Sequence, residues 1–392
     1  MNILIYRYNS ICEPDVINAF QELGHQVSSI DDEITNKRIT PNQTIQLIHS
    51  ALSKNHYDFV FSINFFPVIA EVCNIYHIRY ICWTVDSPVL ELYSYSLSKP
   101  WNRIFMFDSA QYQEFKPYNP DRIFYLPLAC NVSAKHHTAV SASTTLINKY
   151  THKVSFIGSL YSEKNPYIYL KHSSEYMKGY LDALMETQRK IYGTYFLDEM
   201  ITDEIVDYFS KNLTKHYEFP EKTHADYKAL ISQFYMGSNV TVSDRTHLLK
   251  KLSENFPVEI YTFSDTSKLP KLHNCGSANS ITEMPVIFHN SLINLNLTSR
   301  PIRTGIPLRV WDILGCEGFV LTNYQNDLFG YLTPGEHIDI FTSEEELLQK
   351  TAYYLEHPSV CKDIAHAGYE HVKKHHTYLL RCEEMLQAAF SI

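Results

Sequence analysis

Apolar and polar residues alternate through roughly the first third of the chain in the pattern of short strands separated by helices. Each apolar run is four to six residues long, as in buried strands, and most are followed by a segment with helical periodicity. The expected strands are Asn2–Tyr6, Gln26–Ile30, Phe59–Ile63, Tyr80–Thr84, Arg103–Phe107 and Ile123–Leu126, and the first expected helices are Asp15–Leu23 and Asn42–Lys54. Strands that alternate with helices predict a parallel, doubly wound α/β sheet. Ligands bind such sheets beyond the carboxyl ends of the strands.

A polar, Ser/Thr-rich stretch follows at 131–152 and shows no periodicity, so we expect a linker there. The run Val154–Ile157, followed by Gly158-Ser159, predicts the first strand of a second α/β domain. We therefore expect an N-terminal domain over 1–135, a linker over 136–152 and a C-terminal domain over 153–392. Residues 165–236 show helical patterns and no strand pattern, which predicts a helical insertion. The insertion serves either packing and dimerisation or contact with an acceptor substrate.

After the insertion the pattern returns to alternating helices and strands. The expected elements are a helix at Asp244–Glu254, a strand at Val258–Phe263, a loop and helix at 282–290, a strand at Ile293–Leu297, a helix at Ser343–Leu355 and a helical stretch at Val360–Ile392. The helix at Ser343 begins with a Ser-x-x-Glu capping box, in which serine and glutamate each satisfy a free backbone N–H group.

The segment Ile293–Tyr324 carries most of the chemistry that the residues suggest. A turn at Thr304-Gly305-Ile306-Pro307 leads into a short helix, Leu308–Leu314, and then into a strand at Phe319–Thr322. A helix that begins after a strand and a glycine-containing loop offers N–H groups and partial positive charge to a phosphate. Arg309 and Asp312 share one face of this helix, so they can neutralise a diphosphate and bind ribose hydroxyls. The alternative is an ordinary strand–helix–strand unit with a solvated ion pair.

Composition narrows the class of protein. The chain has 392 residues, of which 45% are hydrophobic and 20% charged, so it is long enough for two globular domains. A net charge of −9 does not favour nucleic acid as a partner. The eight cysteines form no CxxC pair and mostly lie in apolar runs, which is typical of reduced, buried thiols in a cytoplasmic protein. The N-terminus reads as a strand rather than a signal peptide, and we expect no transmembrane segment.

The residues from Gly305 to Tyr324, with the phrases GEHIDIFTSEEELLQKTAYYLEHP and IAHAGYEHVKKHHTYLLR, resemble the C-terminal domain of the group 1 glycosyltransferases. Within that family the chain resembles the spore-maturation (CgeB-like) branch, because YICWTVDSPVLELYS, FMFD and YLPLACN look like the N-terminal domain of that branch. The resemblance implies the GT-B fold, in which two Rossmann-like domains face a cleft. It also implies a nucleotide-sugar donor on the C-terminal domain, and an acceptor on the N-terminal domain.

The resemblance can be carried onto individual positions. Asp312 matches the second acid of the family's Glu-x7-Glu pattern, which binds the ribose, whereas Thr304 stands in place of the first acid. The family's basic residue after Gly158 is absent, so Arg309 would supply the positive charge, with Arg300 or Arg303 as further candidates. The residues expected at the donor site, some by position alone, are Gly158, Ser159, Tyr261, Thr262, Met284, Pro285, Thr304, Gly305, Ile306, Pro307, Arg309 and Asp312.

We expect transfer without a metal and without a cofactor, because no Asp-x-Asp triplet occurs and a helix start with an arginine can stabilise a leaving diphosphate. The expected partners are a UDP-linked or related sugar donor and a hydroxyl of a glycan, protein or other bacterial acceptor. If the reaction inverts the sugar, Asp86 is the best candidate base and Asp108 the second; Asp86 is otherwise a turn former that caps the next helix. A retaining reaction needs no such base. The rival hypotheses are a catalytically silent nucleotide-binding or interaction protein and a GT-B isomerase or phosphorylase.

Overall fold

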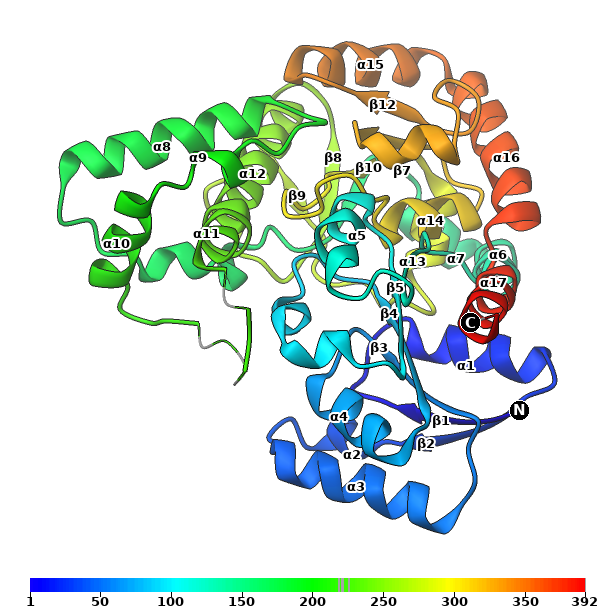
Figure 1. Cartoon of the computed structure of the whole chain (residues 1–392). Coiled ribbons are helices and arrows are strands. Elements are labelled where there is room, and N and C mark those ends of the chain that lie inside the picture. Colours follow the sequence, from blue (N-terminus) through cyan, green and yellow to red (C-terminus); the bar gives the residue numbers. More distant parts are fainter. Residues whose placement is uncertain (218, 220–221, 225, 392) are drawn as a thin grey trace. The chain divides into compact units, whose positions relative to one another are not determined.

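A computed structural model describes residues 1–217, 219, 222–224 and 226–391. The chain divides into two compact units. The N-terminal unit comprises Met1–Ala129 and the described residues of 218–226 and 376–392, and the C-terminal unit comprises Cys130–Tyr217 and Tyr227–His375. Each unit is built around its own six-stranded parallel sheet (Figure 1).

The sheet of the N-terminal unit has the strand order β2-β1-β3-β4-β5-β6. Its strands are β1 (Asn2–Tyr6), β2 (Gln26–Ile30), β3 (Phe59–Ile63), β4 (Arg79–Thr84), β5 (Asn102–Met106) and β6 (Ile123–Tyr125), and all neighbours pair in parallel. Its helices are α1 (Glu13–Glu22), α2 (Asp32–Thr35), α3 (Pro41–Lys54), α4 (Pro67–Tyr76), α5 (Ser109–Phe115) and α17 (Tyr378–Phe390). Strands β3 and β5 are buried along their whole length, as apolar runs predict for the interior of a parallel sheet.

The sheet of the C-terminal unit has the order β12-β11-β10-β7-β8-β9. Its strands are β7 (His152–Ile157), β8 (Val258–Tyr261), β9 (His273–Asn274), β10 (Ser291–Asn296), β11 (Val320–Asn323) and β12 (Asp339–Phe341). Around them lie α12 (Gly237–Asn255), α13 (Met284–Asn290), α14 (Leu308–Gly315), α15 (Glu344–Glu356) and α16 (Pro358–His375). Val154, Ile293 and Leu321, from three adjacent strands, are among the fully buried side chains of its core.

In each sheet the strand order reverses at one point, the topological switch point. In the N-terminal unit the reversal lies between β1 and β3, and in the C-terminal unit it lies between β7 and β10. In open parallel sheets the loops after these two strands diverge, and the crevice between them is the usual ligand site. The predicted doubly wound α/β architecture, with one sheet in each half, is confirmed.

The expected linker is wrong as a description of the local structure. Residues 131–152 contain two helices, α6 (Val132–Val140) and α7 (Thr144–Tyr150), both in the C-terminal unit. The polar residues that suggested a loop are helix caps: Asn131 accepts the Ala134 N–H and Ser143 accepts the Leu146 N–H. Helix α6 packs against α13 and α14.

The stretch Val360–Ile392 was expected to be helical, and its described residues contain two helices: α16 ends at His375 and α17 begins at Tyr378. Thr377 caps α17 by accepting the Leu380 N–H. The two helices belong to different units, and α17 packs against α1.

The stretch 165–236 is helical, as expected. It contains α8 (Glu175–Lys190), α9 (Leu197–Met200), α10 (Asp203–Asn212), α11 (Tyr227–Ala229) and a π-helical segment, Leu230–Met236, that continues into α12. Helix α8 packs against α12. Short 3-10 helices occur at Leu90–Tyr93, Tyr95–Ser98, Lys116–Tyr118, Ser162–Lys164, Pro166–Tyr169 and Asn326–Gly330.

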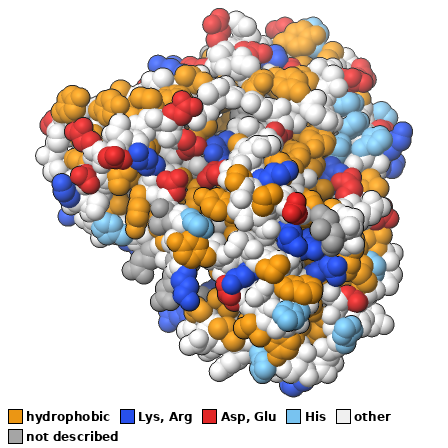
Figure 2. Space-filling model, viewed as in Figure 1, with side chains coloured by type: hydrophobic (Ala, Val, Ile, Leu, Met, Phe, Trp, Pro, Cys, Tyr) orange, Lys and Arg blue, Asp and Glu red, His pale blue; other side chains and the backbone are white. Residues whose placement is uncertain are grey.

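The structure also bears on the state of the cysteines and on the presence of membrane-spanning helices. None of the eight cysteines forms a disulfide, and seven are buried. Within the described ranges, no helix combines the length and apolar character needed to cross a bilayer. Figure 2 shows acidic and basic side chains interspersed over the visible face, with no large patch of one sign.

Candidate functional site

The switch point of the C-terminal sheet is bridged by Arg245, which projects from α12. Its guanidinium donates through Nε to the Leu297 carbonyl at 2.9 Å and through Nη1 to the Ser159 carbonyl at 2.5 Å. Leu297 follows β10 and Ser159 follows β7, so this side chain ties together the two loops that diverge at the switch point. The guanidinium also lies 4.8 Å from the ring centroid of Tyr161.

The charge of Arg245 is buried without a carboxylate to neutralise it. The residue is 9% exposed, its hydrogen-bond acceptors are neutral carbonyls, and no carboxylate of the described residues lies within 4.0 Å of it. Asp244, its neighbour in sequence, is paired with Arg300 instead. Burial lowers the pKa of Arg245, and the nearby Arg309 charge lowers it further. A buried cation of this kind favours a bound anion.

Arg309 supplies a second positive charge from the first turn of α14. Its guanidinium lies 3.5 Å from Asp312 Oδ2 and 3.8 Å from Met284 Sδ, and its side chain remains 26% exposed. Cations are disfavoured at a helix N-terminus, and Pro307 at the N-cap offers no side-chain acceptor for the N–H groups. Burial lowers the pKa of Arg309, although Asp312 opposes that shift. The first turn of α14 therefore presents both N–H groups and a guanidinium to an anion.

Asp312 is held by two cations. Lys135 Nζ, from α6, lies 3.0 Å from Oδ1, and Arg309 approaches Oδ2 from the same helix. The Asp312 side chain is only 5% exposed and that of Lys135 is 17% exposed. Burial alone would lower the pKa of Lys135, but the charge of Asp312 raises it above its ordinary value. The alternative of a solvated Arg309–Asp312 pair is therefore wrong.

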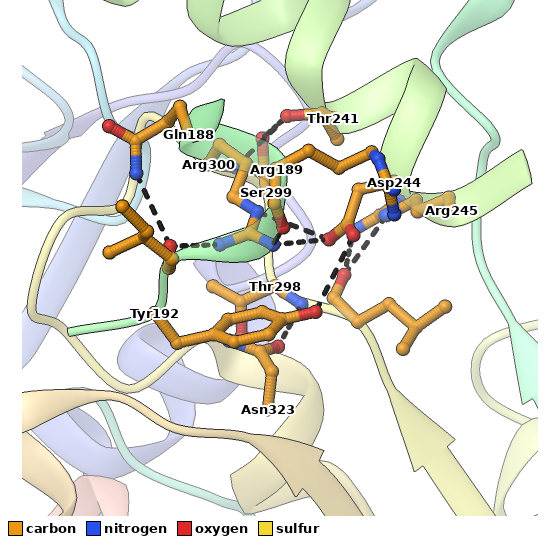
Figure 3. A network of polar contacts seen from close by, with 12 residues as sticks. Gln188, Arg189, Tyr192, Thr241, Asp244, Arg245, Thr298, Ser299, Arg300 and Asn323 are labelled. Atoms are coloured by element: carbon orange, nitrogen blue, oxygen red, sulfur yellow. Dashed lines mark hydrogen bonds and ion pairs between the residues drawn. The ribbon is translucent and has the colours of Figure 1, made fainter. Parts of the chain in front are cut away.

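The loop between β10 and α14 is anchored at several points (Figure 3). Asn323 Oδ1 accepts the Thr298 N–H at 2.7 Å. Gln325 donates to the carbonyls of Ile302 and Gly305 at 3.1 and 3.0 Å. The Asp327 N–H donates to the Thr304 carbonyl at 3.0 Å. These bonds fix the backbone that leads into α14 before any ligand binds.

Arg300 and Arg303 are structural cations. Arg300 donates through Nη2 to Asp244 Oδ2 at 2.8 Å and to the Arg189 carbonyl at 2.7 Å, and its guanidinium lies 4.0 Å from the Tyr192 ring centroid (Figure 3). Arg303 Nη1 lies 3.1 Å from Asp198 Oδ2. Both charges are paired with carboxylates of α12 and α9, which gives them a structural role, and the expectation that they serve a diphosphate stays untested. Arg300 instead joins the end of α8 to the loop before α14.

The loop after β7 also has a defined geometry. A Cβ atom at Gly158 would lie 3.2 Å from the Phe156 ring and 3.8 Å from Arg245 Nη1, so glycine permits a close approach here. The Ser159 hydroxyl donates to Glu163 at 2.6 Å and accepts the Tyr161 N–H at 2.7 Å. Burial raises the pKa of Glu163, but hydrogen bonds from serines lower it more. Tyr161 has a φ of 67°, a left-handed conformation that is uncommon for a non-glycine residue and often marks functional loops.

Of the four residues expected beside the nucleotide base, two lie close to Arg309 and two do not. Met284, at the start of α13, contacts Arg309, and Pro285 follows it in the first turn. The Tyr261 hydroxyl lies 2.7 Å from His152 Nε2, at the start of β7. Thr262 Oγ1 accepts the Ser264 N–H at 3.1 Å. Met284 and Pro285 therefore lie beside the cationic site, whereas the side chains of Tyr261 and Thr262 are engaged elsewhere.

In the N-terminal unit, Asp86 lies beside that unit's own switch point. The Asn64 amide, after β3, donates to Asp86 Oδ2 at 2.7 Å and to the Tyr8 hydroxyl, after β1, at 2.9 Å. Burial and the Asp86 charge raise the pKa of Tyr8. Asp86 is exposed, and the next helix has Val89 at its N-cap, so the helix-cap alternative is not what the structure shows.

Asp108 has a different role. It is fully buried, and its Oδ1 accepts the N–H groups of Ala110 and Gln111 as the N-cap of α5. The prediction that Asp108 is the second candidate base is therefore wrong.

Comparison with known proteins agrees with this architecture. Residues 245–387 match the family model described as glycosyl transferase-like. No curated protein matches the chain significantly. The whole chain is structurally similar to a glycosyltransferase from Rickettsia africae, at 12% identity, with 98% of that chain covered and a TM-score of 0.56.

Two further solved structures are also similar to the whole chain. HepE from Anabaena, solved with UDP and glucose, matches at 9% identity, with 100% of each chain covered and a TM-score of 0.59. Sucrose-phosphate synthase from Thermosynechococcus elongatus matches at 7% identity, with 100% of this chain and 99% of that chain covered and a TM-score of 0.58. The chain has the GT-B fold of glycosyltransferases. The matched family segment begins at Arg245 and contains Arg309 and Asp312.

Three residues of this site were not found from the sequence: Lys135, Tyr161 and Arg245. Arg245 and Lys135 lie on helices far along the chain from α14, and neither belongs to a recognisable motif. The only signal in the sequence was that Arg245 follows Asp244 within an expected helix. This order does not reveal which of the two side chains forms an ion pair.

Proposed function

We propose that this protein is a metal-independent GT-B glycosyltransferase of the CgeB-like branch that uses a UDP-linked sugar as its donor. The acceptor is a hydroxyl of a glycan, a protein or another bacterial molecule in the cytoplasm. The observation that carries this proposal is the pair of guanidiniums at the switch point of the C-terminal sheet. Arg245 is buried without a carboxylate, and Arg309 stands on the first turn of α14.

A UDP-sugar suits this arrangement in charge. Its diphosphate would lie against Arg245, Arg309 and the N–H groups of α14, which together compensate the charge of the leaving UDP. Its ribose would reach Asp312, whose carboxylate can accept two hydroxyl hydrogen bonds. Met284 and Pro285 would lie beside the base. The choice of UDP is supported by HepE, which was solved with UDP and glucose.

The N-terminal unit would receive the acceptor. In an inverting reaction Asp86 would take the proton of the attacking hydroxyl, and Asn64 would hold the carboxylate in place through its 2.7 Å hydrogen bond. Asp86 is exposed and accepts from an amide rather than from an arginine or lysine, so its carboxylate is open to an acceptor hydroxyl and is not neutralised by a cation.

The test is release of UDP from a panel of UDP-sugars, measured with and without simple glycoside acceptors. Wild-type protein should release UDP from at least one donor, and faster with an acceptor. Arg309→Gln should abolish this release, whereas Lys250→Gln, an exposed change on α12, should leave it unchanged. Release that persists in Arg309→Gln would contradict the site.

A second function, nucleotide binding without catalysis, is favoured by one observation. Thr304 occupies the position of the family's first acid, which contacts the donor sugar. A protein of this kind would bind UDP through the same guanidiniums but release none from any donor. Isothermal titration with UDP beside the release assay separates the two functions.

A further inference from the structure

A cavity lies in the C-terminal unit at the amino-terminal ends of the strands, whereas Arg245 lies at their carboxyl ends. It has a volume of about 500 Å³, within the range of small-molecule sites, and is lined by the amino-terminal ends of β7, β10 and β11 and by α16. His152, at the start of β7, lines this cavity, whereas Gly158 follows the end of the same strand. At the rise of a parallel strand these positions are about 20 Å apart, so the cavity is distinct from the donor site.

Cationic side chains border this cavity. Lys153 and Lys362 both line it, both are exposed, and no described carboxylate lies within 4.0 Å of either ammonium. Glu317 also lines it, but its two oxygens face His366 at 2.7 Å and His136 at 3.1 Å. The lysines therefore give the cavity positive charge, and the one lining carboxylate is already engaged by two imidazoles.

A buried hydroxyl adds a directional donor. Ser291, at the start of β10, is 5% exposed, and its Oγ has no hydrogen-bond partner among the described residues. Buried hydroxyl groups nearly always find a partner, because leaving one unsatisfied costs the protein stability. Oγ is itself closed to solvent, so an acceptor atom of a ligand in this cavity would satisfy it once the side chain turns toward the cavity.

The rest of the lining is apolar. Leu292, Phe319 and Ala365 contribute hydrocarbon surface, and Phe319 and Ala365 are buried in the fold. Such a surface suits the body of a small organic ligand rather than a bare inorganic ion.

We propose that this cavity is a binding site for a small amphipathic carboxylate, with its anionic group toward Lys153, Lys362 and the Ser291 hydroxyl and its apolar body against Leu292 and Phe319. The site does not depend on the proposed transfer reaction, because it shares no residue with the donor site. Glu317, which lines the cavity, follows the C-terminal end of α14, and Arg309 lies in the first turn of that helix.

The test uses phenylbutyrate and its uncharged counterpart phenylbutanol, titrated separately into the full chain by calorimetry. Phenylbutyrate should bind saturably, one molecule per chain, and about tenfold more tightly than phenylbutanol. The double variant Lys153→Gln/Lys362→Gln should lose about tenfold in phenylbutyrate affinity, and Ser291→Ala should lose a smaller factor. Lys250→Gln is the matched control and should bind as wild type does, and thermal unfolding verifies that each variant is folded.

Saturating UDP separates this site from the donor site, since it should leave the phenylbutyrate affinity unchanged. Displacement by UDP would place the probe in the donor site and overturn the proposal. Equal affinity for the two probes, unchanged affinity in the double variant, or the absence of saturable binding would also overturn it.

Discussion

Lys135 Nζ lies 3.0 Å from Asp312 Oδ1, and this contact joins α6 to the second turn of α14. Asp312 is the carboxylate expected to bind the ribose, and its other oxygen faces Arg309. The helix that contains Lys135 therefore belongs to the C-terminal unit and supplies a cation that orients a candidate binding residue.

Replacing Lys135 by methionine should destabilise the protein by about 1–3 kcal/mol, because it leaves a largely buried carboxylate with one cation instead of two. Urea unfolding measures this loss. Lys149→Met is the matched control: that lysine, on α7, is 62% exposed and lies 3.8 Å from Glu283, so its loss should cost less than about 1 kcal/mol. Equal costs for the two variants would show that the Lys135–Asp312 contact contributes nothing special.

Arg300→Met should destabilise the protein by about 3–5 kcal/mol, because Asp244 would remain buried without its partner. The double variant Arg300→Met/Asp244→Leu should recover much of that loss, since it removes both charges. Urea unfolding of the two variants provides the comparison. A double variant no more stable than Arg300→Met would indicate that the backbone bonds to residues 189 and 191 matter more than the ion pair.

Asp86→Asn should reduce transfer strongly while leaving UDP affinity unchanged, because the substitution removes a proton acceptor but keeps the shape of the side chain. Initial rates of transfer and calorimetric UDP titrations test the two halves of this prediction. Full transfer activity in the variant would instead support a retaining reaction without a base.

Glu317→Gln should cost more stability near pH 5.5 than near pH 8.5. Burial raises the pKa of Glu317, but hydrogen bonds with His366 and His136 lower it overall. The contribution of Glu317 to stability is therefore lost as the pH falls through the pKa that this residue has in the folded state. The bond to Glu317 raises the pKa of His366, so that contribution is lost as pH rises through the folded value of the histidine. The pair should therefore contribute most between about pH 4.3 and 6.5, the unperturbed values. Thermal unfolding of both proteins at the two pH values tests this, and a pH-independent difference would contradict it.

The sequence was most informative where the signal is local. The strands of the N-terminal sheet, the strands β7, β8, β10 and β11 and the position of α14 follow from apolar runs and turn residues, and the structure confirms them within a few residues. The short edge strands β9 and β12 were not predicted. Residues 131–152 were misread because Asn131 and Ser143 are equally common in loops and at helix caps.

The site was harder to predict because its contacts are distant in sequence. Arg245 reaches the carbonyls of residues 159 and 297, and Lys135 reaches residue 312. Neither contact leaves a periodic pattern, so only the fold reveals it. The same reason explains Arg300, whose commitment to Asp244 cannot be read from its place in the loop before α14.

The central claim is that Arg245 and Arg309 hold the diphosphate of the donor without a metal ion. The most direct measurement is calorimetric titration of UDP and of uridine in EDTA, for wild type, Arg245→Lys and Arg309→Gln. Wild type should bind UDP in EDTA as tightly as with added Mg²⁺, and each variant should lose about tenfold or more in UDP affinity while uridine affinity changes little. UDP binding that requires Mg²⁺, or that is unchanged in both variants, would contradict the account.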